Sequence, residues 1–159
     1  MSPDDEDRYL GELKLHRLLV AIDGSKNAEL ALSAAITAAR RDHASITLLT
    51  VGPDLSASPA AWSVPVSGAL DQQAVDDDAC QRLNDTVDRI PPDIPVQKLY
   101  RRGKPGPEIV KASKEGVYDA ILLGARGLGR VATLMGSVSS HVMHHADTAV
   151  FVAHAPRDE

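Results

Sequence analysis

The sequence predicts an α/β protein, a doubly wound five-stranded parallel sheet with helices on both faces. Strand-like and helix-like segments alternate along the chain, and such alternation requires right-handed crossovers and a covered parallel sheet. The first apolar segment, 18–22, is a continuous run of the kind buried on both faces. Glycines gather after two predicted strands, at 23–25 and 124–136. Ligands of such sheets bind at the carboxyl ends of the strands, where the strand order reverses.

The first third of the chain contains two predicted strands and a helix. Residues 18–22 (LLVAI) form the first strand, which a turn at 23–25 ends. Residues 27–41 are rich in alanine and end in two arginines, which suit the C-terminal end of a helix. Residues 45–51 form the second strand, and the Ser-, Ala- and Pro-rich stretch that follows, to about 68, is predicted to be a long mobile loop.

The middle of the chain repeats this alternation. Apolar residues at helical spacing predict a helix over 70–90, with aspartates in its first turns, where carboxylates are favoured. Two prolines end it, and residues 96–101 form the third strand. A short helix follows over 107–115, closed by Gly116.

The last part supplies two more strands and a helix. We expect a strand over 120–123, a helix over 137–145 and a final strand over 148–154. The final strand is uncharged and is expected at a sheet edge, which proteins usually cover. Pairing of two copies would cover it.

Composition limits the class of protein. The 159 residues suffice for one domain, which we place at 15–156 after a flexible acidic extension at 1–14. A net charge of −5 with scattered basic residues argues against a nucleic-acid partner. Cys80 is the only cysteine, so no intrachain disulfide is available. No apolar run approaches the roughly 20 residues of a membrane span, and the amino terminus lacks a secretory apolar region. We therefore expect a cytoplasmic protein without a membrane span.

Small residues bracket the segment after the fourth predicted strand. Gly124 and Gly127 begin it, and Gly136-Ser137 end it, directly before a predicted helix. Glycines allow backbone amides to approach an anion, and a helix N-terminus, which Ser137 could cap, favours negative charge. The pattern predicts a phosphate cradle, with a wide turn as the alternative. Asp23 offers either a ribose contact or an N-terminal helix cap.

These two motifs resemble the universal stress protein family. The segment LLVAIDGS at 18–25 is moderately specific for the family, and its combination with GARGLG at 124–129 and GSVS at 136–139 is highly specific. The resemblance covers almost the whole chain after about Leu15. Eight residues separate Gly127 from Gly136, where nucleotide-binding members usually have nine, so the chain resembles the ATP-binding subgroup with a phosphate loop one residue short.

The resemblance implies an adenine nucleotide alpha hydrolase-like fold and an ATP site, with AMP or cyclic AMP as alternatives. Mg²⁺ or Mn²⁺ would bind through the phosphates, and no protein side chain is expected to hold the metal. Arg126 and Arg130 would add phosphate contacts or, alternatively, be solvated loop residues. The implied nucleotide-binding residues are Ala21, Ile22, Asp23, Val51, Leu123, Gly124, Gly127, Gly136, Ser137, Val138 and Ser139.

The family is regulatory, usually homodimeric, and has no well-defined reaction. The implied dimer interface is the last strand, through Ala149, Val150, Phe151 and Val152. We therefore expect a nucleotide-binding dimer that acts in the stress response through a protein partner that the sequence does not name. The alternatives are a dimeric interaction protein that does not bind ATP and a weak ATPase. No general base positioned beside a water is evident, so we assign no catalytic residue and expect at most slow ATP hydrolysis.

Three other sequence patterns do not change this expectation. The segment 127–132 matches G-x-G-x-x-A, but Asp147 precedes the next strand and cannot serve as the ribose-binding acid of a dinucleotide fold. The Lys of a Walker A motif is missing. The histidines of the helix over 137–145 suggest a metal site, but no carboxylate or cysteine lies at ligand spacing, so a favourable interaction with the helix dipole is the preferred interpretation.

Overall fold

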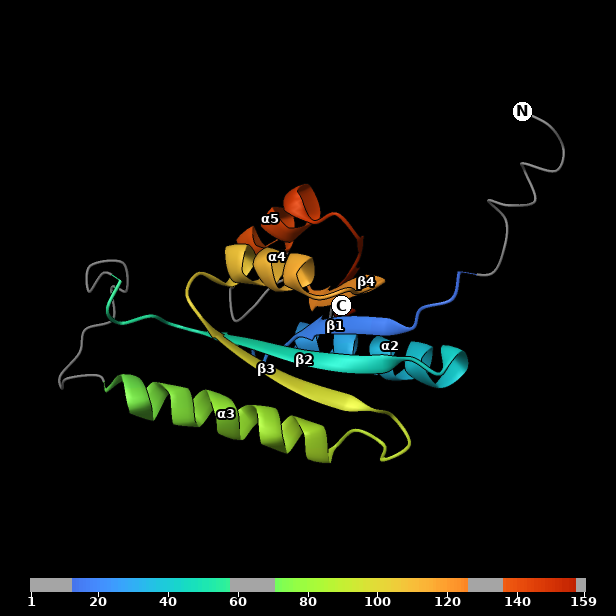
Figure 1. The fold of residues 1–159 in the computed structure, drawn as a ribbon, viewed down its shortest axis with the longest axis horizontal. Coiled ribbons are helices and arrows are strands. Elements are labelled where there is room, and N and C mark those ends of the chain that lie inside the picture. The colour runs from blue at the N-terminus through green and yellow to red at the C-terminus, as the bar shows by residue number, and fades with distance from the viewer. Residues whose placement is uncertain (1–12, 58–70, 126–135, 157–159) are drawn as a thin grey trace, which may run out of the picture.

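The computed structural model describes residues 13–57, 71–125 and 136–156. It contains a five-stranded parallel sheet in the order β3-β2-β1-β4-β5, with α4 and α5 on one face and α2 and α3 on the other (Figure 1). This arrangement confirms the predicted fold class. Among the described residues, no helix has the length and hydrophobicity needed to cross a bilayer.

The elements follow the predicted order, with ends that differ by one or two residues. The strands are β1 (Arg17–Ala21), β2 (Ser45–Gly52), β3 (Val96–Arg102), β4 (Ala120–Gly124) and β5 (Ala149–Ala153). The helices are α2 (Lys26–Asp42), α3 (Gln72–Asp88), α4 (Pro105–Glu115) and α5 (Ser137–His145). Most of the extension expected at 1–14, much of the loop expected after β2, and the central part of the glycine-bracketed segment lie outside the described residues.

Two hydrophobic clusters, one on each face, hold the sheet between the helices. Leu18 and Val20 of β1 belong to the cluster under α2 and α3, whereas Leu19 belongs to the cluster under α4 and α5. All three side chains are fully buried. Because successive side chains of a strand point to opposite faces, a continuous apolar run is what a strand covered on both sides requires.

Two details of the helices differ from the sequence-based predictions. The aspartates expected in the first turns of α3 have different roles. Asp71 is the N-cap and accepts a hydrogen bond from the main-chain nitrogen of Gln73, whereas Asp76 lies farther along the helix and is buried. Ser137 does not cap α5, because Gly136 occupies the N-cap position and Ser137 is the first helical residue. The prediction of Ser137 as a cap was therefore wrong by one position.

Asp76 lies at the centre of a polar cluster that joins α3 to β3. Its carboxylate accepts from the Tyr100 hydroxyl at 2.6 Å and from the Gln72 amide at 2.9 Å, and it forms an ion pair with Arg102. The Gln72 side chain also binds the main chain at Pro53 and Leu55 after β2. The hydrogen bond from Tyr100 lowers the pKa of Asp76 most, followed by the one from Arg102. Burial is the main reason that the pKa of Tyr100 is raised to about 12, and the hydrogen bond to Asp76 is the second.

β5 is an edge strand, as predicted. The side chains of Val150 and Val152 pack against the cluster under α4 and α5, whereas Phe151 on the opposite side is 44% exposed. Ala149 is also exposed. Of the residues expected at a dimer interface, Phe151 is therefore the large apolar side chain that remains available on the surface.

Candidate functional site

The strand order reverses between β1 and β4. The sequence predicted a ligand site at the point of reversal. β1 pairs with β2 on one side and with β4 on the other, so the connections that leave β1 and β4 diverge to opposite faces of the sheet. A divergence of this kind opens a crevice at the carboxyl ends of the two strands.

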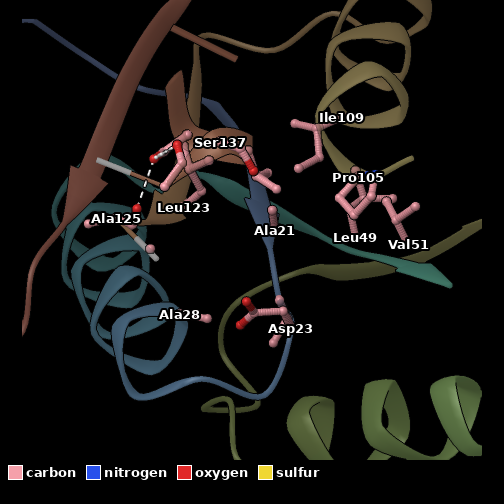
Figure 2. A pocket seen from close by; sticks show the side chains of 15 residues that line it. Ala21, Asp23, Ala28, Leu49, Val51, Pro105, Ile109, Leu123, Ala125 and Ser137 are labelled. Atoms are coloured by element: carbon pink, nitrogen blue, oxygen red, sulfur yellow. Dashed lines mark hydrogen bonds between the residues drawn. The ribbon is translucent and has the colours of Figure 1, made fainter. Parts of the chain in front are cut away.

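A pocket of about 390 Å³ occupies this crevice (Figure 2). Every described residue of the implied nucleotide-binding set lines it, from the end of β1 through Val51 of β2 to the start of α5. Gly127, Arg126 and Arg130 lie outside the described residues. The structure thus brings together residues that are more than 100 positions apart in the sequence.

One side of the pocket is apolar. Leu49 and Val51 of β2 and Pro105 and Ile109 of α4 lie together on this side, as Figure 2 shows. Of these four residues, only Val51 was predicted from the sequence. Leu49 could have been found from strand alternation, because it lies two residues before Val51 and shares its face. The positions of Pro105 and Ile109 at the pocket depend on how α4 packs over β2, which the sequence does not indicate. Ala28 and Ala125 also line the pocket and were not predicted.

Asp23 lies just beyond β1, and its side chain is exposed at the pocket. Its Oδ1 accepts a hydrogen bond from the main-chain nitrogen of Ser25 at 2.9 Å, and Gly24 between them has a φ of +80°, which favours glycine. Ser25, not Asp23, caps α2 by accepting from the main-chain nitrogen of Ala28. The capping alternative for Asp23 is therefore excluded.

Gly124 is needed for close packing at the base of the pocket. A Cβ at this position would lie 2.7 Å from the Cβ of Asn27 and 2.8 Å from the main-chain nitrogen of Ala28. Both distances are far below ordinary contact, and the second neighbour is backbone, which cannot rotate away. The glycine lets β4 approach the first turn of α2, so packing alone explains its identity.

The N-terminus of α5 forms the third side of the pocket. No side chain caps this helix, Gly136 is its N-cap, and the exposed Ser137 is its first residue. The first amides of a helix have no partners within the helix, and together with the helix dipole they attract anions. Among the described lining residues, the only charged side chain is that of Asp23.

Ser139 has a structural contact within the same wall. It is 1% exposed, and its hydroxyl donates toward the main-chain oxygens of Ala125 at 2.9 Å and Gly136 at 3.0 Å. The main-chain nitrogen of Gly136 also donates to the oxygen of Ala125 at 2.7 Å. These bonds fasten the two ends of the glycine-bracketed segment to each other.

Two arginines of β3 near this region, Arg101 and Arg102, form ion pairs with other residues. Arg101 forms an ion pair with Glu115, and Arg102 forms one with Asp76. In the register of β2 and β3, Arg101 is opposite Val51 and Arg102 is opposite Gly52, but neither arginine lines the pocket.

Comparison with known proteins agrees with this architecture. The model of the universal stress protein family matches residues 14–154. The chain belongs to this family. A universal stress protein of Mycobacterium tuberculosis is 29% identical over 153 residues, covering 94% of this chain and 48% of its own length. A Synechocystis universal stress protein is 28% identical and covers 86% of this chain and 96% of its own length.

Solved structures of universal stress proteins share the fold. The universal stress protein UspA from Lactobacillus plantarum superposes with a TM-score of 0.67 at 26% identity, covering 90% of this chain and all of its own. A universal stress protein from Archaeoglobus fulgidus gives a TM-score of 0.62 at 23% identity. This universal stress protein spans about half the length of the mycobacterial relatives it matches.

Proposed function

We propose that this universal stress protein binds an adenine nucleotide, ATP in the first instance, and acts as a regulatory dimer in the stress response. The observation that carries the proposal is the pocket at the β1/β4 switch point, which combines an apolar wall, one carboxylate and one uncapped helix N-terminus. These three features match the three parts of a nucleotide: base, ribose and phosphate.

The apolar wall suits the base. Leu49, Val51, Pro105 and Ile109 present aliphatic surface, and a planar ring gains contact by lying against such side chains. Ala21, Ile22 and Val51, at the ends of β1 and β2, also line the pocket, and we assign the polar edge of adenine to this part of the wall. We assign the base to this side of the pocket.

Asp23 suits the ribose. A carboxylate accepts hydrogen bonds and donates none when ionised, and ribose hydroxyls are donors. The bond from Ser25 engages only Oδ1, and a carboxylate has about four acceptor positions. The Ser25 contact orients the side chain and leaves acceptor capacity for a ligand.

The N-terminus of α5 suits the phosphates. Gly136, Ser137 and Val138 line the pocket there, and the Ser137 hydroxyl is exposed beside the amides of the first turn. Ser139 holds this turn through its bond to Ala125, so we assign it a supporting position in the wall. Mg²⁺ or Mn²⁺ would bind through phosphate oxygens, as it does for other nucleotides.

Two structural neighbours support an adenine nucleotide as the ligand class. One universal stress protein was solved in complex with cAMP, at 21% identity and a TM-score of 0.66. The Archaeoglobus fulgidus protein was solved in complex with dAMP. The two ligands share the adenine base and differ in their sugar and phosphate groups. They therefore support adenine as the recognised base more directly than they support any one phosphate group.

A dimeric interaction protein is the second candidate, favoured by the exposed Phe151 on an uncharged edge strand. Pairing of β5 between two copies would cover this edge, and a two-fold contact is the commonest symmetry.

In the proposed regulatory dimer, nucleotide binding would order the wall at α5 and change which protein partner is accepted. We propose binding as the function, with hydrolysis at most slow.

The experiment that tests the proposal compares ATP, AMP and cyclic AMP by calorimetric titration in the presence of magnesium. We expect Asp23→Ala to weaken binding of ATP and AMP about 10- to 100-fold, the value of one or more charge-assisted hydrogen bonds. The matched control is Asp93→Ala, an exposed carboxylate that precedes β3 and so lies at the amino ends of the strands, away from the pocket. Equal affinities for wild type and Asp23→Ala would contradict the ribose assignment.

A further inference from the structure

A second concave surface lies outside the nucleotide pocket, in an open groove of about 450 Å³ between α4 and α5. His141 and His145 of α5 line it, together with Lys111 and Glu115 of α4. The proposed function uses neither histidine. Gly106 of α4 packs against the His141 side chain, where a Cβ would come within 3.0 Å of it, so the ring is held between the two helices.

The two imidazoles lie one helical turn apart and face each other. Their ring centroids are 4.2 Å apart, and the ring planes are inclined by 20°. Residues at i and i+4 share a helix face, but a shared face alone does not bring rings into contact. Here contact is made, so two nitrogen ligands are available within one small region of the surface.

A main-chain contact selects the tautomer of one neutral ring. Nδ1 of His145 lies 2.8 Å from the main-chain oxygen of His141. A carbonyl oxygen only accepts, so in the neutral ring Nδ1 carries the hydrogen and Nε2 keeps its lone pair. A backbone carbonyl paired with the far nitrogen is the usual way in which proteins orient a metal-binding histidine.

We propose that His141 and His145 bind a divalent transition metal ion of the zinc and copper class. Imidazole nitrogen is a preferred ligand for these ions. A tetrahedral ion with bonds of about 2.0–2.1 Å requires donor nitrogens about 3.4 Å apart. Histidines at i and i+4 of a helix can share one ion in this way, provided that the rings turn out of their stacked arrangement so that both lone pairs point to the ion.

The site has two protein ligands. Within the ranges 13–57, 71–125 and 136–156, no group of three or more His, Cys, Asp and Glu side chains could hold a metal. The Glu115 carboxylate lines the same groove but is paired with Arg101. Water or an external ligand therefore completes the coordination. Lys111 and Lys114 lower the affinity for a cation, although Lys114 pairs with Asp147 at 3.3 Å.

Two ligands on one helix bind a metal more tightly than one, because the second bond forms within the complex. Loss of either histidine should therefore weaken binding at least about tenfold. His144 provides a matched control: it is exposed on the same helix, and its Nδ1 lies 2.8 Å from the main-chain oxygen of Ser140. It has the same fixed tautomer, but its ring is not in the stacked pair.

The test is a calorimetric titration of ZnCl₂ into the full chain, without nucleotide. We expect one zinc ion per chain, at least about tenfold weaker binding in His145→Ala and His141→Asn, and a change of less than about twofold in His144→Ala. Circular dichroism checks that each variant is folded, and His145, being exposed, is the safer substitution. Equal losses in His144→Ala and His145→Ala, or no binding below about 1 mM zinc, would overturn the proposal. Because the groove is separate from the nucleotide pocket, this result is independent of ATP binding.

Discussion

The main-chain nitrogen of Ser25 donates to Oδ1 of Asp23 at 2.9 Å, while the Ser25 hydroxyl accepts from the main-chain nitrogen of Ala28 at 3.2 Å. Two adjacent functions of the turn after β1 are thereby divided between two residues. Ser25 caps α2, and Asp23 faces the pocket. The division means that stability and ligand binding can be separated by mutation.

Ser25→Ala should lower the free energy of unfolding by about 1 kcal/mol, because α2 loses its N-cap. Asp23→Ala should have a smaller effect on stability, since it removes one bond within an exposed turn. Urea denaturation measures both. A larger loss of stability in Asp23→Ala than in Ser25→Ala would show that the roles are reversed.

Gly124→Ala should destabilise the protein by about 1–3 kcal/mol, the usual cost of forcing an extra methyl group into a close-packed site. The added Cβ would collide with Asn27 and with the backbone of Ala28. The collision would push β4 and α2 apart at the base of the pocket. Urea denaturation gives the stability, and an ATP titration on the folded fraction gives the binding. Unchanged stability would mean that α2 moves freely away from β4.

Acid should remove the stabilisation that Asp76 provides. Its pKa is lowered in the folded state by hydrogen bonds from Tyr100 and Arg102, so its contribution is present above the unfolded-state pKa of about 3.9 and is lost as the pH falls through the folded-state pKa. Asp76→Asn should therefore unfold at lower urea than wild type at pH 7, and the difference should shrink below about pH 4. A difference that stays constant between these pH values would contradict this account of Asp76.

Phe151→Glu should convert the proposed dimer to a monomer. The side chain is 44% exposed on the edge strand, and a charge placed there must be desolvated in a paired edge. Light scattering should show half the wild-type mass, and circular dichroism should show that the variant is folded. Val117→Glu is the control, because Val117 is 71% exposed but follows α4 and does not belong to the edge strand. An unchanged mass for Phe151→Glu would place the dimer contact elsewhere.

The sequence predicted the fold well because its central strands, β1, β2 and β4, are buried on both faces. In an α/β chain, a continuous apolar run such as 18–22 is most readily explained as a buried strand. The ends of the helices also have sequence signals, such as Gly116 at the C-cap of α4. Helix starts were less certain. α4 begins at Pro105 rather than at 107, because proline occupies the first turn without needing its missing amide.

The pocket was predicted on its β1, β4 and α5 sides but not on its α4 side. Glycines and Asp23 leave a local signature at strand ends, whereas Ile109 is an ordinary apolar residue of an amphipathic helix. Its place over Leu49 depends on how α4 crosses β2, a tertiary relationship without a short-range signal. The buried position of Asp76 was missed for the same reason, since its partners Tyr100 and Arg102 come from another element.

Amide chemical shifts of the ¹⁵N-labelled protein, followed during addition of ATP and magnesium, test the central claim most directly. The account predicts saturable shifts at Ala21, Ile22 and Val51 and at Ser137 and Val138 at the start of α5, because these residues surround the pocket. Amides of α3, on the other face of the sheet, should change little. Absence of shifts at millimolar ATP, or shifts that saturate elsewhere, would contradict a nucleotide site at the β1/β4 switch point.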